Sequence, residues 1–493
     1  MKLIYDVNDR PPFGKLIAFS IQQLLAIITA TIAVPIIVGS DVLTPAAALL
    51  GAGFGTICYL LFTKFRSPVF LGSSFAFIAP LTGAVAFGYF GVLLGAAFAA
   101  TVYIVIAIVI KLAGTKWINK LMPPVVIGPT VALIGFSLAG NAMGDIVKAS
   151  GSAMSYNLVG LLCGLITFFV IVFCSVQGNK SMKLIPFIIG IAVGYVVASL
   201  FSIIGYVADV DYLKIVDYSA FKTLFEPVRL ESFINYDFSF LHTKGYETLD
   251  GAGVANIALL YIPVTFVVFA EHIADHKNIS SIIERDLITD PGLHRTLLGD
   301  GVGSFVGAVF GGCPNTTYGE SIGCVAITRN ASVVSILGAA VLAIVLAFCA
   351  PVIAFINTIP SCVMGGVCLS LYGFIAVSGL NMLRGIDLGE SKNLFVVSSI
   401  LIAGIGGLTL HFGTDEDGNA IITISSIATA LILGVLVNLF VKAPAIPEKG
   451  DSLPSAHVEA SKTVSENAKE TVPAEGESFE TSETAESEAE VKE

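Results

Sequence analysis

Long apolar runs with short polar breaks between them make up most of this 493-residue sequence. A helix that crosses a bilayer needs about 20 mostly apolar residues. Roughly 14 runs near that length lie between Lys15 and Lys442, at residues 16–39, 43–63, 69–88, 90–112, 124–143, 157–177, 184–205, 254–276, 297–311, 313–328, 331–357, 360–380, 393–412 and 420–441. The pattern predicts an all-α polytopic membrane protein with about 14 transmembrane segments.

The lysines and arginines predict how these segments cross the membrane, because positive residues collect on the cytoplasmic side. With the N-terminus inside, the inner loops hold Lys2, Arg10, Lys15, Lys64, Arg66, Lys111, Lys116, Lys120, Lys180, Lys183, Lys277, Arg285, Arg295, Arg329, Arg384 and Lys392. The short outer loops hold only Lys148, and the long outer stretch 206–253 mixes bases with acids. The alternation predicts that both termini are cytoplasmic, although a re-entrant segment or an error of two crossings would preserve it.

Two of the predicted segments cannot form uninterrupted helices. The third, SPVFLGSSFAFIAP, contains Pro68, Gly72 and Pro80, and the tenth, GGCPNTTYGESIGCVAITR, contains Pro314 and several glycines. Irregular backbone at membrane depth is tolerated where it is buried or lines a cavity, and matched interruptions in two halves indicate a transporter's binding site. Segments 3 and 10 are seven apart, an odd number, so the second seven would begin on the opposite side. We therefore predict two inverted seven-segment repeats.

Composition agrees with a membrane protein and sets the end of the chain apart. Hydrophobic residues make up 55% of the sequence and charged residues only 13%, whereas a soluble domain carries about a quarter. Beyond Ala443 there are 13 acidic residues and four lysines, so residues 443–493 account for −9 of the net charge of −11. Such a segment cannot form an apolar core, and we expect a disordered, cytoplasmic tail. No signal peptide is predicted, since the first apolar run is itself long enough to span.

The remaining residue patterns favour a carrier over other classes of protein. Eight cysteines are scattered through apolar runs without metal-ligand spacing, and no nucleophile–base pair or zinc motif is evident. We therefore predict no metal, no cofactor, no nucleic-acid partner and no enzymatic activity. A channel would need polar groups along a whole pore, whereas here they concentrate near mid-membrane.

Carboxylates inside the apolar runs are the candidate chemistry. An Asp at the centre of a membrane helix costs about 2.5–3.5 kcal/mol on insertion scales and is by default a functional candidate. Glu271 lies deep in the eighth segment, Glu320 lies in the broken tenth, and Asp275 follows Glu271 by one helical turn on the same face. Asp275 and His276 could instead mark a helix end that meets water. His272 is more typical of a packing or capping residue than of a ligand.

These groups predict the kind of ligand. Carboxylates accept hydrogen bonds and the free backbone N–H groups of a broken helix donate them, while Phe75, Phe77 and Tyr318 can cover the face of a ring. The complementary ligand is planar, with N–H donors and C=O acceptors at its edge, such as uracil, xanthine or urate. The carboxylates would repel an anion, and an inorganic cation would need more oxygen ligands.

The same stretches resemble a known family. PNTTYGESIGCVAITR (Pro314–Arg329), LGSSFAFIAP (Leu71–Pro80), AEHIADH (Ala270–His276) and DPGLHRTLLGDG (Asp290–Gly301) are similar to uracil permeases of the nucleobase–ascorbate transporter family. The resemblance covers about residues 10–441. The PNTTYGE stretch is typical of the uracil branch, whereas xanthine and urate relatives usually carry Gln at the position of Glu320.

The resemblance implies a proton-coupled nucleobase symporter of the cell membrane that works by an elevator movement, with uracil as first candidate and xanthine or urate as alternatives. It implies a moving core and a gate through which such proteins commonly form homodimers, and short strands in segments 3 and 10 that pair antiparallel. The implied parts are a cytoplasmic N-terminus (1–15), the core (16–112 and 254–357), the gate (113–205 and 358–442), and an extracytoplasmic loop (206–253).

By motif match, the resemblance also implies roles for single residues. Glu271 and Glu320 would accept hydrogen bonds from the ring, and the main chains of Phe75 and Gly319 would donate to its carbonyls. Ala30 and Tyr318 would line the pocket.

Proton coupling would involve Asp275 and Glu271, because two neighbouring carboxylates at low dielectric cannot both stay ionised cheaply. Two positions depart from the family pattern. Ser321 stands where the family usually has Asn, and Asp275 stands where well-known relatives have His.

Overall fold

The computed structural model is mostly helical and describes residues 3–39, 41–148, 156–225, 233–235, 249–414 and 420–441. The acidic tail lies outside the described residues. The helices are α1 (Phe13–Val38), α2 (Pro45–Phe62), α3 (Ile78–Ala84), α4 (Gly88–Ala113), α5 (Lys116–Leu121), α6 (Pro124–Ile146), α7 (Leu158–Val176), α8 (Lys180–Leu184), α9 (Pro186–Ala208), α10 (Ser219–Phe225), α11 (Gly251–Ile283), α12 (Leu293–Val309), α13 (Gly319–Thr328), α14 (Val333–Ala347), α15 (Ala350–Asn357), α16 (Ser361–Asn381), α17 (Ser391–Ile405) and α18 (Ser426–Phe440). The strands are β1 (Leu71–Ser73), β2 (Asn315–Thr317), β3 (Leu410–Thr414) and β4 (Ala420–Ile424).

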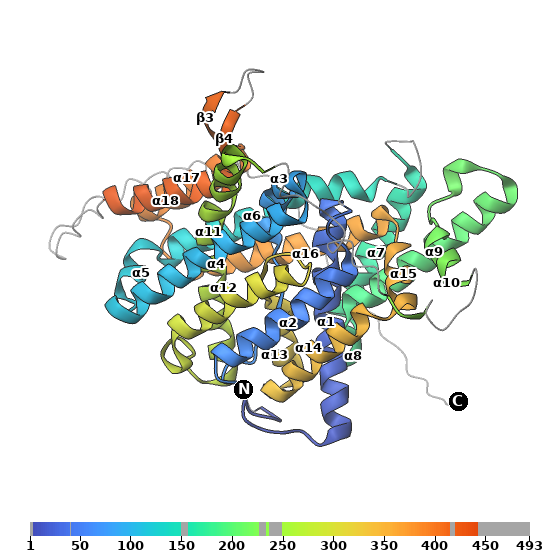
Figure 1. Ribbon diagram of the computed structural model, residues 1–493, viewed down its shortest axis with the longest axis horizontal. Coiled ribbons are helices and arrows are strands. Elements are labelled where there is room, and N and C mark those ends of the chain that lie inside the picture. The colour runs from blue at the N-terminus through green and yellow to red at the C-terminus, as the bar shows by residue number, and fades with distance from the viewer. Residues whose placement is uncertain are drawn as a thin grey trace, which may run out of the picture. The chain divides into compact units, whose positions relative to one another are not determined.

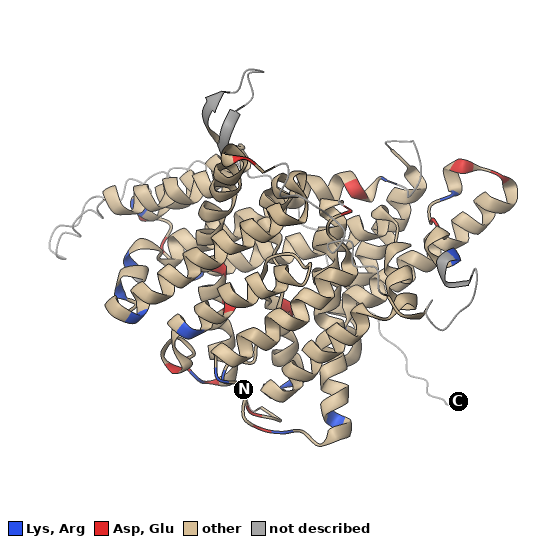
Figure 2. Cartoon of the chain, viewed as in Figure 1, with Lys and Arg blue, Asp and Glu red and all other residues tan. Residues whose placement is uncertain are grey.

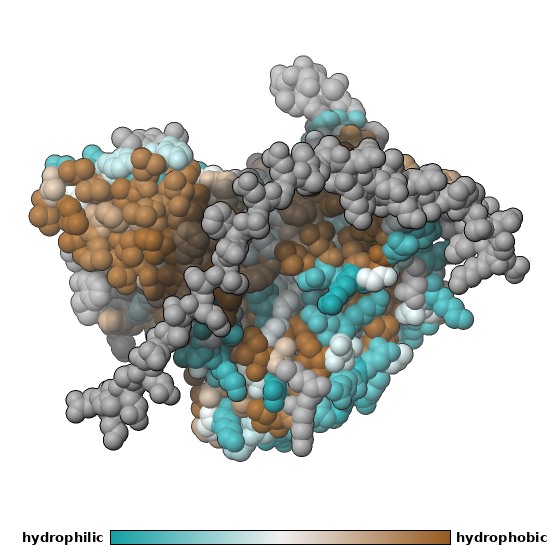
Figure 3. Space-filling view, turned by 180° about the vertical axis from the view of Figure 1, so that it is seen from behind, coloured by the Kyte–Doolittle hydropathy of each residue, from teal (hydrophilic) through white to brown (hydrophobic). Residues whose placement is uncertain are grey.

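Helix length and surface chemistry both indicate a multi-pass membrane protein. Within the described ranges, eight helical stretches of 18 residues or more are apolar enough to cross a membrane, and α14, α17 and α18 are shorter apolar helices. Figure 3 shows apolar surface over α7 and α9, where side chains such as Phe169, Val176, Leu200 and Ile203 are exposed. Figure 2 shows acidic residues in the middle of the helices as well as at their ends. Apolar side chains that point outward are stable only if lipid or another apolar surface covers them.

Several predicted segments differ in extent from the helices that form. The apolar run 331–357 is divided into α14 and α15, and α11 continues seven residues beyond the predicted end at 276. The runs 393–412 and 420–441 are only partly helical, because β3 and β4 form an antiparallel hairpin between α17 and α18. Glycines end α17, with Gly407 at a φ of 73°, a backbone conformation that glycine adopts without strain. Apolarity alone does not distinguish a hairpin of this kind from a helix end.

Two short strands meet inside the helices. β1 pairs with β2 antiparallel, with Leu71 opposite Thr317 and Ser73 opposite Asn315. All six residues of the pair are buried. Each strand is followed by helical backbone, β1 by a short turn and α3 and β2 by α13. Only glycine fits at position 72, because the ring of Tyr318 lies where the Cβ of any other residue would be.

Helices distant in the sequence pack together in two sets (Figure 1). α2 packs on α12 and α14, α4 packs on α11 and α12, and α1 packs on α14. In the other set, α6 packs on α16 and α17, α7 packs on α9 and α16, and α17 packs on α18. The first set is drawn from residues 13–113 and 251–347, and the second from residues 124–208 and 361–440. Contacts between the sets include those of α11 with α6 and α18.

The N-terminal segment lies along the junction between α13 and α14. The N–H of Ile4 donates to the carbonyl of Arg329 (2.8 Å), and the N–H of Ala331 donates to the carbonyl of Tyr5 (2.9 Å). Arg285 pairs with Asp6 beyond the end of α11. The segment predicted only as a cytoplasmic terminus is therefore ordered against the first helix set.

Candidate functional site

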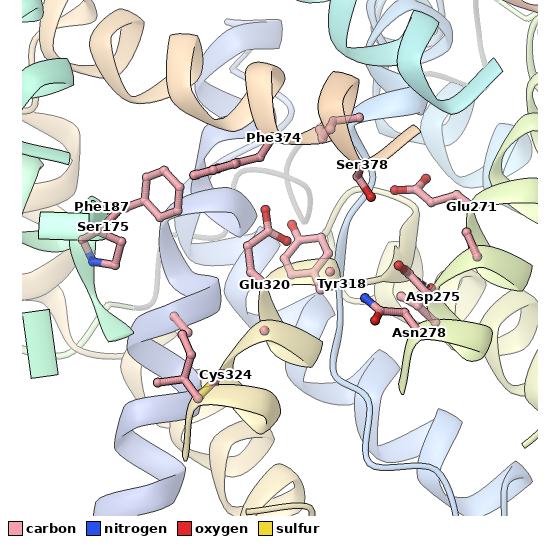
Figure 4. Close-up of a pocket in the computed structure, with 18 of the residues that line it drawn as sticks. Ser175, Phe187, Glu271, Asp275, Asn278, Tyr318, Glu320, Cys324, Phe374 and Ser378 are labelled. Carbon is pink, nitrogen blue, oxygen red and sulfur yellow. Dashed lines mark hydrogen bonds between the residues drawn. The ribbon is translucent and has the colours of Figure 1, made fainter. Parts of the chain in front are cut away.

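A cavity of about 600 Å³ lies between the two helix sets. Figure 4 shows Glu271, Asp275 and Asn278 on one side, Ser175 and Phe187 on the other, and Tyr318 and Glu320 between them. All three predicted carboxylates line it, together with Phe75, Tyr318 and Gly319. Ala30 is fully buried in α1 and is not among the residues that line this cavity. The chain thus brings six of the seven predicted site residues to one place.

Helix α11 presents carboxylates to the cavity because of its periodicity. Glu271, Ala274, Asp275 and Asn278 line the cavity, and they follow the i, i+3, i+4, i+7 spacing of one helix face. His276 is fully buried on another face of α11, so the alternative in which it meets water at a helix end is wrong.

The strand β2 and the start of α13 provide the facing wall. Asp275 accepts a hydrogen bond at Oδ2 from the hydroxyl of Thr317 (2.7 Å), which links α11 to β2. The hydroxyl of Tyr318 donates to the carbonyl of Ser73 in β1 (2.8 Å). Glu320 occupies the first turn of α13, where free N–H groups and the helix dipole favour a negative charge. Thr317 was not a predicted site residue. The signal that could have identified it is its place three residues before Glu320, in the segment expected to form a short strand.

Ser321, which directly follows Glu320 in α13, joins three segments next to the site. Its Oγ accepts hydrogen bonds from the side-chain amide of Gln23 (2.5 Å) and from the backbone N–H of Phe70 (3.1 Å). Ser321 is completely buried and Gln23 is nearly so. The residue that departs from the family pattern therefore ties α1 and the approach to β1 to the start of α13.

Behind α11, a second group of polar side chains is completely buried. His272 Nδ1 lies 2.7 Å from Asp300 Oδ2, and His272 Nε2 lies 3.0 Å from the hydroxyl of Thr296. His276 Nε2 lies 2.8 Å from the hydroxyl of Tyr59, and the two histidine rings stack with centroids 4.0 Å apart. Sequence reasoning missed Asp300, although it lies inside the ninth apolar run and the rule that singled out Glu271 applies to it equally. His272 is completely buried, is hydrogen-bonded at both ring nitrogens and does not line the cavity.

Phe75 lies between this cavity and a second cavity of about 730 Å³. The second cavity is lined by residues from the C-terminal end of α6, among them Asn141 and Asp145, by Lys148 just beyond that helix, and by residues at the start of α18. The ring of Phe75 meets that of Tyr372 edge-on, with centroids 5.7 Å apart and an interplanar angle of 82°. Phe75 precedes α3, which packs on α4 and α11 of the first helix set, whereas Tyr372 belongs to α16 of the second.

Comparisons with known proteins agree on one class of membrane protein. The profile of a permease family matches residues 14–413. The uracil permease of Bacillus caldolyticus is 40% identical over 92% of this chain and 97% of its own length. The uracil permease of Bacillus subtilis (strain 168) is 37% identical over 93% and 99%, and that of Escherichia coli (strain K12) is 35% identical over 87% and 94%. These relatives are named as permeases, not as enzymes.

Two solved structures are similar in fold. The transmembrane domain of the cyanobacterium bicarbonate transporter BicA aligns with a TM-score of 0.54 at 14% identity, over 87% of this chain and 97% of that chain. The murine anion transporter Slc26a9 in its inward-facing state aligns with a TM-score of 0.54 at 9% identity, over 88% and 68%. At these identities the likeness extends to the fold alone.

Proposed function

Because this chain belongs to the permease family, as its resemblance to nucleobase–ascorbate transporters predicts, we propose that it carries uracil across the cell membrane. The observation that carries the proposal is the combination of near full-length similarity to uracil permeases with a cavity that Glu271 of α11 and Glu320 of α13 both line. Uracil offers two ring N–H donors, and two carboxylates are complementary acceptors.

In this proposal the nucleobase lies in the cavity where α13 begins. Glu271 and Glu320 accept from its ring nitrogens, and the main-chain N–H groups of Phe75 and Gly319 donate to its carbonyls. Tyr318 contributes a cavity wall. The start of α13 supports this orientation because the first N–H groups of a helix point out of it and have no carbonyl partner within it.

We assign proton coupling to Asp275 together with Glu271. The two lie one turn apart on the same face of α11 and line the same cavity, so a proton that reaches one is available to the other. Asp275 accepts its hydrogen bond from Thr317 in β2, so a change in its charge would be felt by the strand that leads to Glu320. Symport follows if the proton and the nucleobase occupy this cavity together.

The proposed topology has 14 crossings in two inverted repeats, with both termini cytoplasmic. It is supported by the described elements that would cross, which are α1, α2, β1 with α3, α4, α6, α7, α9, α11, α12, β2 with α13, α14, α16, α17 and α18. The antiparallel β1–β2 pair joins the third element to the tenth. The first helix set would move as an elevator past the second, through which two copies would form a dimer.

Binding of labelled uracil tests the proposal, and we expect Glu271→Ala and Glu320→Ala each to weaken it. A lost charged hydrogen bond costs about 1.5–3 kcal/mol, which corresponds to about 10- to 150-fold in affinity. The matched control is Asp41→Ala, a carboxylate outside both cavities, which should bind like the unaltered protein. Unlabelled xanthine and urate compete in the same assay, and displacement by either better than by uracil would assign the chain to the alternative substrates. Unchanged affinity in either Glu variant would exclude that residue as a ligand.

A further inference from the structure

The cavity is longer than a single ring requires. Along α13 it is lined from Gly319 to Ile327, which at 1.5 Å per residue is about 12 Å. Along α11 it is lined from Glu271 to Asn278, about 10 Å by the same rise. A cavity of about 600 Å³ falls in the range that holds drug-sized ligands, whereas a pyrimidine ring needs only the end where the carboxylates lie.

Charge is sorted along this length. The carboxylates of Glu271, Asp275 and Glu320 lie at the start of each wall, and Lys180 and Lys183 of α8 line the same cavity. Helix α8 packs against α13, and its Leu184 is buried with Cys324, the next turn of α13 beyond Glu320. Helix α8, which carries both lysines, therefore packs on α13 one turn beyond Glu320 rather than at the start of that helix.

Both lysines are available to a ligand. They are exposed, and within the described residues no ion pair or side-chain hydrogen bond engages either ammonium group. A cytoplasmic location alone would account for basic residues here. However, Lys111 and Lys116 satisfy that rule on the same predicted side without lining this cavity. The rule therefore does not require that two lysines line the cavity.

We propose that a uracil nucleoside monophosphate from the cytoplasm also binds this cavity and blocks uracil, with its phosphate on Lys180 and Lys183 and its base beside the carboxylates, where the one ring N–H that remains donates to Glu271 or Glu320. This inference rests on the proposed function, since it uses the same base site. A phosphate monoester carries about −1.5 to −2 charges at pH 7, and lysine binds it as a point charge. Asp275 repels an anion that lies among the carboxylates. It does not repel in the same way a phosphate that lies beside Lys180 and Lys183, which we call the mouth of the cavity.

The section between the two ends suits a sugar. Gly323 faces open space, because no atom lies within 4 Å of the position of a Cβ there. Asn278, across the cavity on α11 and one turn beyond Asp275, is exposed to it and can donate to and accept from ribose hydroxyls. A ligand held at both ends would bridge α13, which packs on α1 and α11 of the first helix set, to α8, which connects α7 and α9 of the second. It would therefore hold the two sets in the present arrangement and stop transport.

Competition for labelled uracil on the purified full-length protein, in neutral detergent without anionic lipid, tests this inference. Uridine 5′-monophosphate should displace uracil, uridine should do so about tenfold less well, and inorganic phosphate should not. That factor is what loss of about one charged hydrogen bond produces, since screening weakens both exposed lysines. The Lys180→Gln/Lys183→Gln variant should lose about tenfold in affinity for the monophosphate while its uracil affinity stays within about twofold. Lys148→Gln, at the second cavity, is the matched control and should change neither.

Added salt should weaken the monophosphate but not uracil. The inference is overturned if the monophosphate fails to displace bound uracil, if the double variant still binds it as well as the unaltered protein, or if inorganic phosphate competes equally. It is also overturned if phosphatidylglycerol abolishes the competition without changing uracil affinity, because the lysines would then bind lipid headgroups. Failure of uracil itself to bind would instead refute the proposed function.

Discussion

Replacing Ser321 with alanine should loosen the junction of α1, β1 and α13 next to the proposed nucleobase site. The hydroxyl accepts two hydrogen bonds, from the amide of Gln23 and from the N–H of Phe70. Alanine accepts neither, and all three residues are buried. The loss therefore leaves donors that water cannot reach.

The magnitude follows from what each donor can do afterwards. An unsatisfied buried donor costs about 1–3 kcal/mol. The Gln23 amide already lies 3.3 Å from the carbonyl of Ser321 and can keep that partner. The Phe70 N–H belongs to the main chain just before β1 and has no comparable substitute. We therefore expect a loss of about 1–3 kcal/mol rather than twice that value, and a fall of a few degrees in the melting temperature.

Thermal unfolding in detergent measures this loss, and Ser74→Ala is the matched control. The hydroxyl of Ser74 is also buried beside β1, but it has no hydrogen-bond partner among the described residues, so its removal should be neutral or slightly stabilising. Combining Ser321→Ala with Gln23→Leu should cost less than the sum of the two single changes, because the pair is in direct contact. Equal melting of Ser321→Ala and Ser74→Ala, or strict additivity of the pair, would refute the assignment of Ser321 as a clamp.

Two further predictions concern residues that line the cavity. Asp275→Asn keeps an acceptor oxygen for Thr317, so it should still bind uracil but lose accumulation driven by a pH gradient. If one proton is carried with each uracil, that accumulation is about tenfold for each pH unit across the membrane. Asp275→His should retain some drive with a shifted pH optimum, since the two side chains start near pKa 3.9 and 6.5, and full accumulation by Asp275→Asn in proteoliposomes would leave Glu271 as the coupling residue. Cys324 lines the cavity but is only 4% exposed, and a buried thiol reacts slowly, so N-ethylmaleimide should leave uracil binding unchanged in the unaltered protein and in Cys324→Ala alike. A block of uracil binding that Cys324→Ala resists would show instead that this thiol is accessible from the cavity.

Local patterns in the sequence predicted much of the site because the residues concerned obey short-range rules. Glu271 and Asp275 share a face through helical periodicity, and Glu320 stands in a segment that proline and glycine prevent from being a continuous helix. The family resemblance is confirmed by the relatives and the permease profile. The structure brings the predicted carboxylates into one cavity, while their roles stay predictions.

Other features depend on contacts that no local pattern encodes. Gln23 and Ser321 are 298 positions apart, and nothing near either residue indicates the other. The N-terminal segment binds the α13–α14 junction through main-chain groups, which every sequence has. The cavity mouth is a similar case, since Lys180 and Lys183 satisfy the charge rule for cytoplasmic loops whether or not a cavity lies beside them.

The placement of polar groups bears on which parts can move together. Asp300, His272 and Thr296 join α11 to α12, and His276 with Tyr59 joins α11 to α2, all through hydrogen bonds that are fully buried. Parting these helices would leave such groups unpaired, at a cost of about 1–3 kcal/mol each. Between the two helix sets, by contrast, Phe75 meets Tyr372 edge-on. Separating these two rings loses dispersion energy but leaves no hydrogen-bonded polar group unpaired. An elevator needs a unit that moves without deforming and a boundary that slides, and this distribution of buried hydrogen bonds supports the first helix set as that unit.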